Sequence, residues 1–126
     1  MKAKQYLVIG VGRFGSALAT TLYNLGHDVV VVDQLEARVE EVMEHVTHAL
    51  IMDATDEDAL AKLELGSFDQ VAVTIGNDLE ASVLTIMAVK SQGARRVLSK
   101  AATETAAQVM YKVGADRVVR PEHDMG

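Results

Sequence analysis

The chain has 126 residues, 49% of them hydrophobic and 24% charged, so it is long enough for one ordinary domain with a buried core and too short for two. Its net charge of −6 leaves no basic surplus to neutralise phosphates, which argues against general nucleic-acid binding. It contains no cysteine, which excludes disulfides and thiolate zinc sites, and its first apolar run is too short for a signal peptide or a membrane span.

Short apolar runs alternate with longer amphipathic stretches along the whole chain. The apolar runs predict strands at Tyr6–Ile9, Val29–Val32, His48–Met52, Gln70–Ile75, Arg96–Ser99 and Arg117–Val119. Because these runs are continuously apolar rather than alternating, they predict a parallel sheet covered on both faces. Six strands with helical crossovers predict a Rossmann-like, doubly wound α/β sheet in the strand order 3-2-1-4-5-6. No linker interrupts the pattern, so residues 1–126 are expected to form a single domain.

Helical stretches fill the intervals between the predicted strands. The first runs from a glycine turn to Leu25 and is expected to end at Gly26, since glycine is favoured just past a helix end. The second carries glutamates on its wet side, and its Val39, Val42 and Met43 are expected to face inward.

The remaining helices are predicted at Asp56–Leu63, Leu79–Ser91 and Thr103–Lys112. Thr55 is expected to open the first of these through a Thr-x-x-Asp arrangement with Asp58, and Asp78 is expected to cap the second. The second is highly apolar, and an exposed side would be costly to hydrate, which favours an oligomer. Burial of that side between the sheet and neighbouring elements is the alternative.

The run Gly10-Val11-Gly12-Arg13-Phe14-Gly15 is a G-x-G-x-x-G that directly follows a predicted strand and opens a predicted helix. Gly10 permits a tight turn, Gly12 lets the backbone approach a phosphate, and Gly15 lets the helix pack close to the sheet. The unpaired N–H groups at the helix start then face an anion. The sequence therefore predicts a nucleotide-phosphate site here.

Asp33 ends the second strand, 18 residues past Gly15, where this fingerprint places an acid on a pair of ribose hydroxyls. Gln34 follows it and is included in the predicted site. An acid at this position disfavours a 2′-phosphate, so NADP is the least favoured ligand. A second interpretation is that Asp33 caps the helix that starts after Leu35, and the two roles are compatible.

Arg13 is an unusual residue for the interior of a glycine loop. A guanidinium there lies beside the diphosphate and has reach for a further phosphate or for a neighbouring subunit. The alternative is a solvated arginine, although a cation is mildly unfavourable at the start of a helix.

Two tripeptides follow the third and fourth strands, at the edge where open α/β sheets bind ligands. They are Asp53-Ala54-Thr55 and Ile75-Gly76-Asn77. We expect both to line the site, although Asp53 and Thr55 can also cap a helix and Asn77 can simply turn the chain. Lys100 ends the fifth strand, where it either completes an anion site or is a surface lysine.

Together these residues resemble the RCK domain, also called the KTN or TrkA-N domain. The resemblance rests on Val8-Ile9-Gly10-Val11-Gly12-Arg13-Phe14-Gly15, on Gly26-His27-Asp28-Val29 with Asp33, on Asp53-Ala54-Thr55, and on the ending Gly114-Ala115-Asp116-Arg117-Val118-Val119-Arg120-Pro121-Glu122. It covers essentially the whole chain. It is similar in particular to the cytoplasmic regulatory subunits of Ktr and Trk potassium-uptake systems.

The resemblance implies a nucleotide-responsive assembly. Such domains dimerise and can build an octameric ring on the inner face of the membrane, beneath a potassium translocator. ATP and ADP favour different conformations of the ring, and NAD(H) can occupy the same cleft. Relatives also continue into a small second domain, so a TrkA-C-like domain is expected to be missing after Gly126.

The resemblance also implies roles for individual residues. Arg13 and Lys100 approach the phosphates, Asp33 the ribose, Asp53 and Ala54 the adenine, and Ile75, Gly76 and Asn77 form the cleft floor. Glu122 is placed near the dimer interface, where relatives can hold a divalent cation. Some relatives have a histidine where this chain has Ala106, so no contact is carried over there.

The alternative function is an NAD-dependent oxidoreductase or a fragment of a redox-sensing regulator. An oxidoreductase needs a general acid or base beside the cofactor, usually on a second domain. His27, His45 and His48 are predicted at the edge of the sheet opposite the ligand, and His123 lies beyond Pro121. A redox-sensing repressor needs a basic DNA-binding module, which this composition does not supply. The sequence therefore favours a sensor that is not an enzyme.

Overall fold

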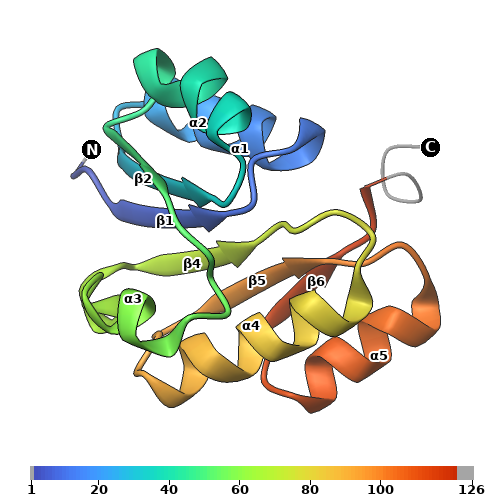
Figure 1. Ribbon diagram of the computed structural model, residues 1–126. Helices are drawn as coiled ribbons and strands as arrows, with labels where there is room; N and C mark the ends of the chain where they lie inside the picture. The colour runs from blue at the N-terminus through green and yellow to red at the C-terminus, as the bar shows by residue number, and fades with distance from the viewer. Residues whose placement is uncertain (1, 122–126) are drawn as a thin grey trace.

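The computed structural model describes residues 2–121, which form one six-stranded sheet with helices on both faces (Figure 1). All pairings are parallel, and the strand order is β3-β2-β1-β4-β5-β6. The predicted doubly wound Rossmann-like sheet and its order are therefore confirmed. The N-terminal strand lies at the centre, with β2 on one side and β4 on the other.

The elements follow one another with short connections, and their ends lie within a few residues of the predicted ones. The strands are β1 Gln5–Ile9, β2 Asp28–Asp33, β3 His48–Ile51, β4 Gln70–Val73, β5 Val97–Lys100 and β6 Arg117–Val119. The α-helices are α1 Arg13–Asn24, α2 Glu36–Val42, α3 Glu57–Ala61, α4 Leu79–Ser91 and α5 Glu104–Lys112, and the 3₁₀ turns are η1 Met43–His45 and η2 Leu65–Ser67.

The sheet separates two hydrophobic cores. Successive side chains of a strand point to opposite faces, so Leu7 and Ile9 of β1 join one core while Val8 joins the other. α1 and α2 cover the face of Val8, and α3, α4 and α5 cover the opposite face (Figure 1). This double burial explains why the central strands are continuously apolar in sequence.

Two expectations about the short elements are wrong. Asp56, not Thr55, caps α3: the Asp56 carboxylate accepts from the N–H groups of Asp58 at 3.0 Å and Ala59 at 3.2 Å. The hydroxyl of Thr55 instead donates to Asp53 at 2.7 Å. Met43 does not face inward, because α2 ends at Val42 and the chain tightens into η1, which leaves Met43 52% exposed.

Other helix ends follow the expected chemistry. The carboxylate of Asp78 accepts from the N–H of Ala81 at 3.0 Å at the start of α4, and Thr103 makes the equivalent bond to Ala106 at α5. Gly26 follows α1 with a φ of +95°, a conformation that glycine adopts without strain. The predicted cap at Asp78 and stop at Gly26 are therefore confirmed.

Asp116 ties the second half of the sheet together. Its Oδ2 accepts from the Nζ of Lys90, at the end of α4, at 2.8 Å and from the N–H of Val97, at the start of β5, at 2.7 Å. The hydrogen bond from Lys90 is the largest cause of the lowered pKa of Asp116; partial burial opposes it, and the Val97 N–H adds to it. One carboxylate thus joins α4 and β5 to the turn before β6.

We expect Asp116→Asn, which removes the charge but keeps an acceptor, to lower the free energy of unfolding at pH 7 by about 0.5–1 kcal/mol, a small value because the pair is partly solvated. Because the pKa of Asp116 is lower in the folded protein than its ordinary value of 3.8, the ionised carboxylate stabilises the fold above that pH. This stabilisation is lost as the pH falls through the pKa of the folded state. The difference from wild type should therefore disappear in acid. Urea unfolding at several pH values tests this, with the exposed Glu41→Gln as control; an equal difference at pH 7 and pH 3 would contradict it.

Candidate functional site

A cavity opens where the chain leaves β1 and β4 towards opposite faces of the sheet. β1 leads into α1 on one face and β4 into α4 on the other, and such a switch point is where open α/β sheets bind ligands. The cavity has a volume of about 100 Å³. It is lined by Ile9, Gly10, Val32, Asp33, Gln34, Arg38, Met52, Asp53, Ala54, Thr55, Ile75, Gly76, Ala81 and Thr85.

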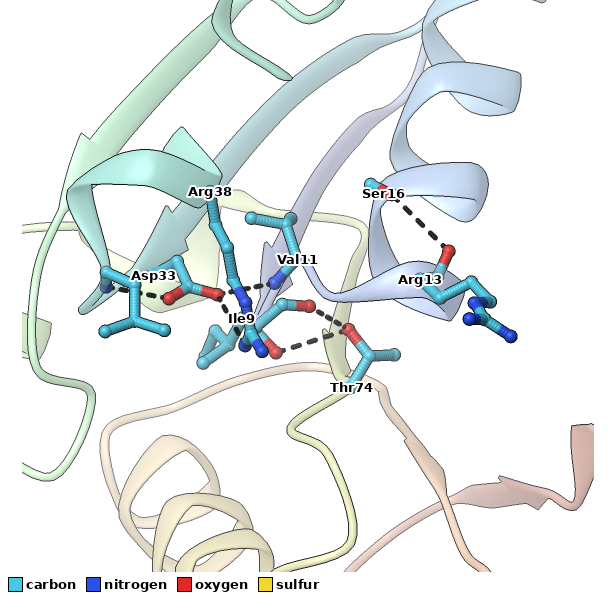
Figure 2. A network of polar contacts seen from close by, with 9 residues as sticks. Ile9, Val11, Arg13, Ser16, Asp33, Arg38 and Thr74 are labelled. Atoms are coloured by element: carbon cyan, nitrogen blue, oxygen red, sulfur yellow. Dashed lines mark hydrogen bonds and ion pairs between the residues drawn. The ribbon is translucent and has the colours of Figure 1, made fainter. Parts of the chain in front are cut away.

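The glycine loop is packed tightly against the end of β4. Gly10 has a φ of +91°, and a Cβ on it would lie 2.8 Å from the carbonyl oxygen of Thr74. A Cβ on Gly15 would collide with the Gly10 carbonyl and with the Thr74 hydroxyl. That hydroxyl donates to the Gly10 carbonyl at 2.6 Å (Figure 2). Both glycines are therefore required by close approach, as the fingerprint predicts.

The start of α1 has no capping side chain. Gly12 occupies the cap position without a side-chain hydrogen bond, and the first turn contains no acidic residue. The N–H groups of this turn are thus available to an anion, and the helix dipole adds to the attraction. The residues present fit a bound phosphate at this point.

The Asp33 carboxylate fastens the glycine loop to the loop after β2. Its Oδ2 accepts from the N–H of Val11 at 2.9 Å, and its Oδ1 accepts from the N–H of Leu35 at 2.9 Å (Figure 2). The side chain is only 4% exposed. The hydrogen bond from Leu35 places the Asp33 carboxylate in the turn before α2, but Leu35 occupies the cap position without a side-chain hydrogen bond, so the interpretation of Asp33 as the cap is wrong. Contact with a ribose stays a prediction, which the remaining lone pairs permit.

Arg38 was not predicted, and it completes this corner of the site. Its Nη1 lies 3.7 Å from the Oδ2 of Asp33, and its side chain is about half exposed. The same Nη1 lies 3.9 Å from the position that a Cβ on Gly12 would take, which is an ordinary van der Waals distance. An arginine five residues past the acid is a signal that sequence reasoning can use, because an arginine near the ribose-binding acid is a known partner of the 2′-phosphate of NADP.

Asp53 and Thr55 form a local turn at the cavity. The Oδ1 of Asp53 accepts from both the hydroxyl and the N–H of Thr55, at 2.7 and 2.9 Å. These two bonds lower the pKa of Asp53 from its ordinary value, and the bond from the hydroxyl has the larger effect. Burial has a smaller effect in the opposite direction. A charged and locally satisfied carboxylate therefore stands beside the buried Ala54.

The structure brings most of the predicted residues together. The lining includes the predicted Gly10, Asp33, Gln34, Asp53, Ala54, Thr55, Ile75 and Gly76. Val11, Gly12, Phe14 and Gly15 belong to the loop and first turn beside it. Arg13 lies on the far side of the loop from Asp33, with its guanidinium directed away from that carboxylate (Figure 2). Neither Arg13, Asn77 nor Lys100 lines the cavity.

Besides Arg38, sequence reasoning missed six lining or supporting residues, which are Ile9, Val32, Met52, Thr74, Ala81 and Thr85. Thr74 carries a usable signal, since it is a polar residue at the end of an apolar strand. Thr85 and Ala81 lie inside α4, where a helical pattern does not tell which side chains reach the end of the sheet.

The described residues 2–121 contain no group of three or more histidine, aspartate or glutamate side chains placed to hold a metal ion. Glu122, predicted as a cation ligand at a dimer interface, lies outside the described residues, as does His123. Within the described part of the chain, no helix is long and apolar enough to cross a membrane.

Several known proteins are similar to this chain in sequence. It is 40% identical over 126 residues to the Ktr system potassium uptake protein A of Bacillus subtilis, covering 100% of this chain and 57% of that protein. It is 41% identical over 123 residues to the protein of the same name from Vibrio alginolyticus, covering 98% and 56%. The chain thus spans little more than half the length of these relatives.

Solved structures share the fold. The NAD(P)-binding domain of an exopolyphosphatase-related protein from Archaeoglobus fulgidus superposes with a TM-score of 0.86 at 24% identity, covering 97% of this chain and 91% of that one. The GsuK channel bound to NAD gives a TM-score of 0.80 and GsuK bound to ADP gives 0.79, both at 17% identity over 94% of this chain, which is 21% and 31% of those chains.

The family assignment follows from the length of the match. The TrkA-N domain family matches residues 6–121, which include all six strands except the first residue of β1, and the whole glycine loop. The predicted resemblance is confirmed: the chain belongs to the TrkA-N domain family.

Proposed function

We propose that this domain binds an adenine nucleotide, ATP, ADP or NAD(H), across the carboxyl edge of β1, β2 and β4. The observation that carries the proposal is the pairing of an uncapped α1 start with a buried carboxylate, Asp33, one strand away. The first supplies N–H groups for phosphates and the second supplies acceptors for ribose hydroxyls. Ile75, Gly76, Asp53 and Ala54 are assigned to the base side.

We further propose that the domain is the regulatory part of a potassium-uptake system rather than an enzyme. The support is that the relatives at 40% and 41% identity are named as potassium uptake proteins. In this proposal it lies in the cytoplasm and reaches the membrane only through a translocator subunit. GsuK, part of which shares this fold, has been solved with NAD and with ADP, and this supports a nucleotide ligand for the domain.

The proposed mechanism is a shift between two conformations of the assembly. A ligand shifts such an equilibrium only by its difference in affinity for the two states. ATP and ADP share the adenine, ribose and first two phosphates, so the terminal phosphate is the source of that difference. Arg13, exposed at the start of α1, is the proposed reader of this phosphate, with Lys100 and a divalent cation as further candidates.

Thermal melts with different nucleotides test the binding proposal. A ligand at a hundred times its dissociation constant adds about 2.7 kcal/mol, which should raise the melting temperature by roughly 5–15 °C. We expect ATP, ADP and NAD to give such shifts and NADP to give a smaller one, because Asp33 repels a 2′-phosphate. Equal shifts from NAD and NADP would contradict the proposed contact between Asp33 and the ribose, and would indicate that Arg38 neutralises the Asp33 carboxylate.

Replacement of Asp33 by Ala should weaken nucleotide binding by about 1.5–3 kcal/mol if charged hydrogen bonds to the ribose are lost. The same change also releases the N–H groups of Val11 and Leu35, so the melting temperature without nucleotide should fall as well. Thr74→Val, which loosens the loop through the other anchor, is the comparison. If both variants lose the same binding energy, Asp33 acts through loop geometry alone.

Replacement of Arg13 by Ala should reduce affinity for ATP roughly ten- to a hundredfold more than affinity for ADP, and should barely change affinity for NAD. The backbone N–H groups of the loop remain, so the diphosphate should still bind. Calorimetry with the three ligands measures this, and Arg117→Ala, an exposed arginine at the start of β6, is the matched control. Equal weakening of all three ligands would show that Arg13 supports the diphosphate generally.

We also propose that the protein is a homo-oligomer, a dimer that builds an octameric ring. The support beyond the family is a pair of exposed apolar side chains one turn apart on α4. These are Leu84 at 50% and Met87 at 51% exposure. A second copy of the same surface would remove them from water.

Light scattering should therefore give a mass that is a multiple of 13.6 kDa at micromolar concentration. Met87→Glu should shift the protein towards the monomer, because a charge would be buried in the contact. Met43→Glu, an equally exposed methionine on the other face of the sheet, should leave the mass unchanged. A mass of one chain for wild type at every concentration, with and without nucleotide, would refute the proposal for this domain.

A further inference from the structure

Thr85 lines the cavity and carries an unpaired hydroxyl. It lies in the second turn of α4, its exposure is 0%, and it belongs to the cavity lining. Its Oγ1 has no hydrogen-bond partner among residues 2–121. Buried polar groups are nearly always paired, so this hydroxyl calls for an explanation.

Three other hydroxyls of the fold show the usual pairing. A threonine inside a helix normally donates to a backbone carbonyl one turn back, and Ser91 of the same helix does so to Ala88 at 2.9 Å. The buried hydroxyls of Thr74 and Ser99, on neighbouring strand ends, are also bonded to backbone carbonyls. Of these four side chains, Thr85 alone has no partner, and it alone lines the cavity.

The cavity walls suit a flat, mostly apolar ring with a polar edge. Besides Thr85, the lining contains six aliphatic or thioether side chains, which are Ile9, Val32, Met52, Ala54, Ile75 and Ala81. The charged residues of the lining are Asp33 at the end of β2, Arg38 on α2 and Asp53 after β3. At about 100 Å³ the cavity is too small for a whole nucleotide, so only one part of the ligand enters it.

We propose that this part is the purine base and that the Thr85 hydroxyl hydrogen-bonds its edge. A hydroxyl both donates and accepts, so it can pair with a ring nitrogen or with the exocyclic amino group of adenine. Thr85 then acts as a base-recognition residue, separate from the phosphate-binding loop. This inference rests on the proposed function, since it assigns a residue to the base of the same nucleotide.

The assignment predicts opposite effects on the free and the bound protein. Thr85→Val replaces the hydroxyl by a methyl of the same shape, so it removes an unpaired buried polar group and should raise the melting temperature without ligand. The same change should weaken ADP binding roughly 3- to 10-fold, because one hydrogen bond to the base is lost. Thr85→Ser, which keeps the hydroxyl, should keep ADP affinity within about twofold of wild type.

Two controls separate base recognition from other roles. Inorganic pyrophosphate lacks the base, so competition against ADP should give the same pyrophosphate affinity for wild type and Thr85→Val. Ser82→Ala removes another buried hydroxyl of α4 that does not line the cavity, and it should not alter ADP affinity.

Titration calorimetry with ADP, together with melts of each variant, decides between the outcomes. If wild type binds no ADP, the proposed function falls and this inference falls with it. If wild type binds ADP and Thr85→Val binds it equally well, the proposed function stands and the role of Thr85 is wrong. A loss of stability in Thr85→Val, with ADP affinity unchanged, would likewise assign the hydroxyl to structure. Equal weakening of ADP and pyrophosphate would also overturn the inference, because the effect would then not concern the base.

Discussion

The close contact between the start of α1 and the ends of β1 and β4 is the constraint on which the site depends. Gly15 lies against the Gly10 carbonyl, and the Thr74 hydroxyl bonds that same carbonyl, so no side chain fits between helix and sheet. This contact aims the helix start at the switch point and forces the loop to expose its N–H groups there. The remaining features of the site, from Asp33 to the walls of the cavity, are arranged around that point.

Asp33 links recognition to the stability of the loop. Its carboxylate already bonds Val11 and Leu35 and faces Arg38, so a ligand at Asp33 contacts a group that also determines the loop's position. A change in the charge balance around this carboxylate is therefore transmitted to the glycine loop and to the start of α2 together. These are separate elements of the chain, and one buried side chain joins them.

The sequence was sufficient for the strand order and for most of the cavity lining, because continuous apolar strands and the glycine fingerprint have few structural solutions. It failed where a competing partner decides the outcome: Asp53 takes the Thr55 hydroxyl, so Asp56 caps α3. Met43 was misassigned because a period of 3.6 residues does not show where a helix tightens into a 3₁₀ turn. Arg38 and Thr85 reach the site through the three-dimensional crossing of α2 and α4 with the sheet edge, which periodicity does not encode.

The central position of β1 has a consequence for how the domain is made. The segment from β1 to β3 contains the strand pairs β1–β2 and β2–β3, and all of it is synthesised before β4. Closure of β1 against β4 then joins residues that are 64 apart in the chain, as for Tyr6 and Gln70. The cavity takes its walls from both sides of that junction. A molecule bound in the cavity would therefore stabilise only the finished sheet. It would stabilise the completed fold and would not guide the first steps of folding.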